Sequence, residues 1–263
     1  MPAFYAHSRF GTRVEGKMEG ELKELIQKYR RQFEIGLQGP DLFFFYRAYA
    51  SNPVSGFGIY LHGVSAYPFF KYGVKVVKKV GRDSPEYGYL MGFLCHFILD
   101  SECHPYVEEM IEKTGVQHME IEEEFEKLLL RMDGRNPFTY PIAKLVPTDK
   151  VTAKAIAKFY QPMDRKTVRG ALRWLKFVKN LFTQEKPWKQ NGINRIMKAV
   201  GKYERYKGVM NLLEDNPACR ESNEGLLMRS NEAEELAVEM ICALDHCIQT
   251  GAALPERLDR TFE

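Results

Sequence analysis

The sequence has 263 residues, of which 44% are hydrophobic and 28% charged, and a formal net charge of +3. This composition is typical of a globular protein and excludes a disordered or fibrous chain. The longest apolar run, Leu90–Leu99, is shorter than the ~20 residues that span a bilayer, so we expect no transmembrane helix. The sequence starts without a secretory signal pattern, and its five cysteines form no paired motif, so we expect a cytoplasmic protein.

Apolar residues recur at helical spacing along most of the chain, and no segment shows the sustained alternation of a strand. The predicted fold class is therefore all-α, a helical bundle in a single domain of residues 1–263. From about Ala252 onward the chain has the composition of a tail. The predicted helices are Glu19–Phe33, Leu61–Val80, Tyr87–Cys103, Ile121–Met132, Lys150–Tyr160, Arg165–Phe182 and Ala233–Gln249.

The predicted helix Tyr87–Cys103 carries metal-capable residues at a spacing of four. His96, Asp100 and His104 return to nearly the same helix face, and their neighbours Phe97–Leu99 are apolar. Burial of a lone Asp100 would cost several kcal/mol unless its charge were paired. A divalent metal ion would supply that pairing. Pro105 disfavours helical backbone in the residue before it, so we expect the helix to end near His104.

Two further segments carry metal-capable residues. His118 and Glu122 are again four apart, so on a helix they can chelate one divalent ion. Asp41 follows Gly39-Pro40, which predicts that it lies in the first turn of a helix. Imidazole and carboxylate are the ligands that zinc takes in catalytic sites. A single histidine of this kind is more often a core residue bound to a backbone carbonyl, but the combined set favours a metal site.

These residues occur in a string of motifs that resembles the zinc-dependent phospholipase C family, which is related to the zinc-dependent single-strand nucleases. The motifs cover residues 1 to about 130. His246 has no place among them, and we interpret it as structural. In chain order the matching pieces are an early His7, LQGPDLFFFY with Asp41, LHG with His62, GFLCHFILDSECHPY with His96, Asp100 and His104, and HMEIE with His118 and Glu122.

The resemblance implies an all-helical fold with two or three zinc ions at the base of a cleft. It also implies hydrolysis of a phosphate ester by a metal-activated water, with Asp41 as the catalytic residue that orients or deprotonates this water. Three groups of ligands are implied: Asp41, His62, His96 and Asp100 for one ion; His104, His118 and Glu122 for a second; and His7 with a bridging Asp100 and the N-terminal amine and carbonyl for a third.

Three functions remain open at this stage. The first is a phosphodiesterase of the phospholipase C type, whose substrate is a phospholipid or a similar head group. The second is a phosphodiesterase or nuclease that acts on single-stranded nucleic acid or nucleotides. The third is a non-catalytic metal-binding scaffold.

Charge is divided unevenly along the sequence. Residues 144–207 hold 17 Lys and Arg against four acidic residues, a balance of +13, which leaves 3 − 13 = −10 for the rest. The turn-rich stretch Gly134–Thr148 separates a metal-ligand half, residues 1–133, from a basic helical half, residues 144–263. Such a difference in sign indicates an anionic partner or an internal electrostatic match.

The basic half offers two candidate binding segments. Residues 164–182 form a basic amphipathic pattern with Trp174 and Phe177, which suits peripheral contact with an anionic membrane. An ordinary bundle helix with a solvated basic face has the same pattern. A weaker signal for nucleic acid comes from aromatic residues among lysines and arginines, which can stack on a single strand. These aromatic residues are Trp188, Tyr203 and Tyr206.

Overall fold

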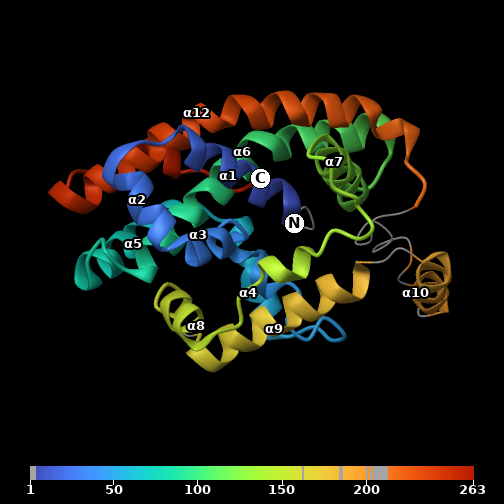
Figure 1. Cartoon of the computed structure of the whole chain (residues 1–263), viewed down its shortest axis with the longest axis horizontal. Helices are drawn as coiled ribbons and strands as arrows, with labels where there is room; N and C mark the ends of the chain where they lie inside the picture. The colour runs from blue at the N-terminus through green and yellow to red at the C-terminus, as the bar shows by residue number, and fades with distance from the viewer. Residues whose placement is uncertain (1–3, 162, 184–185, 200, 202, 204–212) are drawn as a thin grey trace.

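The structure is a computed structural model that describes residues 4–161, 163–183, 186–199, 201, 203 and 213–263. Within these ranges every regular element is a helix (Figure 1), which confirms the all-α fold. The elements are α1 (Phe4–Lys17), α2 (Gly20–Lys28), α3 (Arg30–Gly36), η1 (Gly39–Phe43), α4 (Pro53–His62), α5 (Tyr67–Val80), α6 (Pro85–Thr114), α7 (His118–Met132), η2 (Ile142–Leu145), α8 (Lys150–Ala157), α9 (Arg165–Phe182), α10 (Pro187–Ala199), η4 (Pro217–Cys219), α12 (Arg220–Thr250) and η5 (Glu256–Leu258).

Helix α6 is the centre of the core. All of residues 86–101 are buried, because the helix is apolar on nearly every side and other helices surround it. Its most extensive contacts are with α3 and α12, and α12 runs along the upper side of the molecule in Figure 1. His96 and Asp100 therefore lie in the middle of the fold. No helix in the described ranges is long and apolar enough to cross a membrane.

Two glycines allow α3 and α6 to approach each other closely. A Cβ atom on Gly92 would lie 2.1 Å from the carbonyl oxygen of Phe33. A Cβ atom on Gly36 would lie 2.4 Å from the carbonyl oxygen of Tyr89. Both separations are far below van der Waals contact, so the two backbones touch where only glycine fits.

Several predicted helix boundaries are wrong. The segment Glu19–Phe33 forms two helices, because the chain turns at Tyr29, whose φ of −108° and ψ of 31° are not helical. The second prediction, Leu61–Val80, joins the last two residues of α4 to α5, which begins only at Tyr67. The predicted helix Lys150–Tyr160 is longer than α8, and the predicted helix Ala233–Gln249 is shorter than α12. The prediction Arg165–Phe182 matches α9.

The expected end of α6 near His104 is also wrong. The helix continues through Pro105 to Thr114 and ends at Gly115, whose φ of 72° is a left-handed cap. Proline removes one backbone donor and crowds the carbonyl four residues earlier. The helix continues because the residues on both sides of the proline, His104 and Tyr106 among them, are buried against the rest of the fold.

Residues 252–263 are not a loose tail. Leu258 and Phe262 are buried, and the backbone N–H of Ala66 donates to the carbonyl of Arg260 at 2.9 Å. The guanidinium of Arg257 forms an ion pair with Glu102 on α6. These contacts fold the segment back onto α6 and onto the loop that follows α4.

We expect Gly92→Ala to destabilise the fold, because the added methyl group must separate α3 from α6. Overpacking of this kind costs about 1–3 kcal/mol, or more where backbone atoms are in the way. Urea unfolding followed by circular dichroism measures the change. Gly192→Ala is the matched control, since that helical glycine has open space around its Cβ position. Equal stability of the two variants would contradict the close approach.

Candidate metal centre

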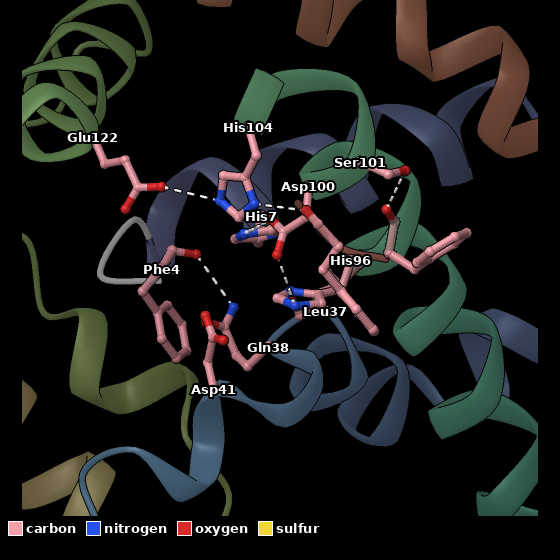
Figure 2. A network of polar contacts seen from close by, with 12 residues as sticks. Phe4, His7, Leu37, Gln38, Asp41, His96, Asp100, Ser101, His104 and Glu122 are labelled. Atoms are coloured by element: carbon pink, nitrogen blue, oxygen red, sulfur yellow. Dashed lines mark hydrogen bonds and ion pairs between the residues drawn. The ribbon is translucent and has the colours of Figure 1, made fainter. Parts of the chain in front are cut away.

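The eight predicted ligand side chains come from five elements and face one region of the core. Figure 2 shows His7, Asp41, Asp100 and Glu122 directed toward this region from different helices. Seven of the eight are buried, and His118 is 34% exposed. By element they are His7 on α1, Asp41 in the first turn of η1, His62 at the end of α4, His96, Asp100 and His104 on α6, and His118 and Glu122 at the start of α7.

The structure gathers these residues into three groups that could each hold a metal ion. In each group the ligand atoms lie within 4.8 Å of one another. The first two groups share a histidine of α6, so they adjoin, whereas the third is built from α6 and α7. The groups are His7, His96 and Asp100; Asp41, His62 and His96; and His104, His118 and Glu122.

The carboxylate of Asp100 faces two sets of histidines with its two oxygens. Oδ1 lies 3.2 Å from Nε2 of His7. Oδ2 lies 3.1 Å from Nε2 of His96 and 3.9 Å from Nε2 of His62. The two oxygens of one carboxylate thus face histidines of both adjoining groups.

The Asp100 oxygens and the histidine nitrogens that they face are arranged like the ligands of metal ions. Both Asp100 oxygens and Nε2 of His62 and His96 are buried, and none makes a hydrogen bond of normal geometry with a residue in the described ranges. Two ligands each ~2.0–2.1 Å from a tetrahedral zinc ion are about 3.3 Å apart, close to the separations found here. The residues present therefore fit zinc.

Backbone carbonyls fix the orientation of three of the imidazole rings. Nδ1 of His62 donates to the carbonyl of Gly58 at 3.0 Å, and Nδ1 of His96 donates to that of Leu37 at 3.1 Å. Nδ1 of His104 donates to the carbonyl of Phe262 at 2.6 Å. Because each Nδ1 carries a proton, Nε2 is the nitrogen of each ring that is left for a metal.

Phe262 is a contributor to the site that the sequence interpretation missed. Its backbone N–H donates to the carbonyl of His62 at 3.3 Å, in addition to its carbonyl bond with His104. Its ring centroid lies 5.1 Å from that of His62 and 5.7 Å from that of His96. Its only sequence signal is a large apolar side chain close to the end of the sequence.

Gly39 positions the ring of His96 from the other side. Its φ of +45° favours glycine, and a Cβ atom there would lie 2.1 Å from the His96 ring. The glycine of the LQGPD motif is therefore needed for its backbone conformation and for the space that His96 occupies. Asp41, two residues later, places Oδ1 2.9 Å from Nε2 of His62.

The protonation states of the two adjoining groups suit metal binding. Burial alone would raise the pKa of Asp100, but the surrounding histidines, His96 foremost, lower it well below its usual range. Burial lowers the pKa of His96 itself. At neutral pH the site thus offers an ionised carboxylate and a neutral imidazole, the forms that bind a divalent cation.

The third group holds a proton instead. Burial would lower the pKa of His104, but the negative charges of Asp100 and Glu122 outweigh it and raise this pKa to about 9. The pKa of His118 is also raised, because Glu122 offsets its burial. Without metal, His104 therefore keeps a proton at neutral pH, and a metal ion must displace it.

The family of zinc-dependent phospholipase C matches residues 6–188. The chain belongs to this family. The match extends beyond residue 130, where the resemblance in the sequence ends, and includes α8 and α9, whereas α12 and Phe262 lie outside it. No curated protein and no solved structure matches the chain significantly. Family and geometry together support a zinc-dependent phosphodiesterase.

We expect zinc binding at the third group to release protons and to strengthen as the pH rises toward about 9, because His104 must lose its proton. Calorimetric titration of the protein with zinc, in two buffers of different ionisation enthalpy, measures this release. His104→Ala should release fewer protons at neutral pH. Zinc binding that is independent of pH would contradict the assignment.

We expect Phe262→Ala to weaken zinc binding by about tenfold, because the ring orients His62 and His96. Equilibrium dialysis against zinc measures the affinity. Phe159→Ala is the control, since this buried ring packs against Phe69 and Tyr89, away from the ligands. Both variants should lower the melting temperature. An equal loss of zinc from both would mean that Phe262 acts through stability alone.

Proposed function

We propose that the protein is a zinc-dependent phosphoesterase that hydrolyses a phosphodiester, with a phospholipid or phospholipid-like head group as its substrate class. The observation that carries this proposal is the buried carboxylate of Asp100, which faces two sets of histidines with its two oxygens. A carboxylate shared in this way suits neighbouring metal ions, which stabilise the attacking and leaving oxygens of a phosphate ester.

The ligand assignment differs from the three groups in two respects, because it adds Asp100 to the group of Asp41 and His62 and leaves His96 out of the group of His7. Asp100 would be shared between two of the two or three zinc ions that these residues would hold. Residues 1–3, which include the N-terminal amine predicted as a ligand, lie outside the described ranges. The proposed ligands are Asp41, His62, His96 and Asp100 for one ion; His104, His118 and Glu122 for a second; and His7 and Asp100 for a third.

Bound zinc would supply positive charge toward the phosphate and lower the pKa of water to ~7. The chain itself contributes three carboxylates, Asp41, Asp100 and Glu122, whose charge is outweighed by that of two or three divalent ions. Such a site attracts a phosphate anion. The buried histidine rings exclude bulk water around these charges, which strengthens every electrostatic interaction within the site.

Asp41 is the proposed proton acceptor. It reaches the site from η1, below the cluster in Figure 2, whereas Asp100 enters from α6. Burial would raise the pKa of Asp41, but the contact with His62 and the other surrounding groups lower it, so the carboxylate is ionised at neutral pH. It can therefore orient the attacking water and take its proton.

We expect two or three zinc ions per chain by elemental analysis, and turnover of bis-p-nitrophenyl phosphate or p-nitrophenyl phosphorylcholine. Asp100→Asn should lose at least one zinc ion and lower turnover by about two orders of magnitude. Asp245→Asn is the control, since this buried carboxylate pairs with Arg82 and Tyr87 and not with a histidine.

The other outcomes separate the alternatives. Turnover of a single-stranded oligonucleotide that falls steeply with salt, and none of the phosphorylcholine ester, would favour the nuclease. Zinc binding without turnover of any of these substrates would favour the metal-binding scaffold. Folded protein that takes up no zinc would overturn the assignment of the ligands.

A further inference from the structure

Three aromatic rings gather at the surface between η1 and α9. The ring centroids of Tyr49 and Trp174 are 5.7 Å apart, as are those of Trp174 and Phe177. Tyr49 is 70% exposed and Phe177 is 56% exposed. Large apolar side chains clustered in water mark a surface that contacts something else.

The exposed face of α9 is separate from the face that builds the core. Val168 and Leu172 are buried, and Arg169 and Lys176 donate to the backbone carbonyls of Thr148 and Val146. Four positions to either side of Phe177 lie Arg173 and Leu181, which are both exposed. This exposed stripe combines one cationic and two apolar side chains, and none of them is part of the core.

The loop that carries Tyr49 adds a second cation. Arg47 has a φ of +48°, the left-handed region that is unfavourable for a residue with a Cβ atom. Its side chain is exposed, and its guanidinium lies 5.3 Å from the ring centroid of Tyr46. The strained turn thus presents Arg47 and Tyr49 outward at its tip.

The elements around this cluster almost lack negative charge. Residues 42–82 contain no Asp or Glu, and residues 150–183 contain nine Lys and Arg but one acidic residue. Arg173 forms no ion pair with a residue in the described ranges. By contrast, α12 carries seven acidic residues and two arginines. In Figure 1, α8 and α9 follow the lower edge of the molecule and α12 follows the upper one.

We infer that this aromatic–basic face, defined as Arg47, Tyr49, Arg173, Trp174, Phe177 and Leu181, docks on the surface of an anionic phospholipid bilayer. The inference rests on the proposed function, because the proposed phospholipid substrate is a component of such a bilayer. Arginines near an anionic leaflet gain electrostatic attraction, and aromatic rings partition to the headgroup region. The aliphatic Leu181 suits the acyl boundary and offers nothing on which a nucleic-acid base can stack.

Flotation of the full, zinc-loaded chain with vesicles tests the docking. We compare vesicles of phosphatidylcholine alone with vesicles of phosphatidylcholine and phosphatidylglycerol in equal parts, at low and high salt. The chain should bind the anionic vesicles more strongly, and salt should weaken that binding. Phe177→Ser should lower the partition coefficient by about fivefold, and Arg173→Glu by about tenfold or more.

The matched controls lie on α12. Met228→Ser removes a side chain that is 52% exposed, and Arg220→Glu reverses an exposed charge. Neither should change vesicle binding, and all four variants should keep the melting temperature and the turnover of p-nitrophenyl phosphorylcholine. Equal binding by Phe177→Ser, Arg173→Glu and the unmodified chain would overturn the inference. Preferential binding of a single-stranded oligonucleotide through these residues would also overturn it.

The docking and the proposed function fail in different ways. Vesicle binding that is lost in Arg173→Glu, in a protein that hydrolyses no phosphodiester, would leave the docking surface in place and remove the proposed function. Turnover of soluble esters without vesicle binding would leave the function and overturn the docking.

Discussion

The structure depends on compensation of the negative charge of Asp100, which is buried near the middle of the central helix α6. A carboxylate in such a place is costly unless positive or polar groups compensate it. The compensating imidazoles of His7, His62 and His96 come from α1, α4 and α6, so they meet only when these helices have packed. Metal binding and folding are therefore coupled, since the unfolded chain has no such site.

Orientation of the ligands is a property of the tertiary structure. His62 takes its backbone acceptor from its own helix, but His96 takes it from the end of α3 and His104 takes it from Phe262. Gly39 limits the His96 ring from a further direction. Each ring is thus held on one nitrogen, that of His96 and that of His104 by a distant segment, which leaves the other nitrogen directed at the metal centre.

Features of the site that depend on local periodicity could be predicted from the sequence. The spacing of four between His96 and Asp100, and between His118 and Glu122, places each pair on one helix face whatever surrounds it. The all-α fold follows from the same periodicity. Features that depend on contacts between distant segments could not be predicted, because tertiary packing overrides local preference. They are the role of Phe262, the continuation of α6 through Pro105 and the break at Tyr29.

The basic residues of the second half of the sequence fall into two classes in the structure, those paired within the protein and those exposed at its surface. Part of the basic half is matched internally: Lys158 forms an ion pair with the buried Glu86, and Arg169 and Lys176 satisfy backbone carbonyls. Arg173 is exposed beside aromatic rings, where no described acidic residue pairs with it. Lys179, near the end of α9, is also matched internally, because its charge acts on the buried Glu123 and Glu126 of α7, but no such match is found for Arg173 among the described residues. The charge that remains on α9 is therefore available to an anionic partner, and the neighbouring rings favour one with an apolar interior.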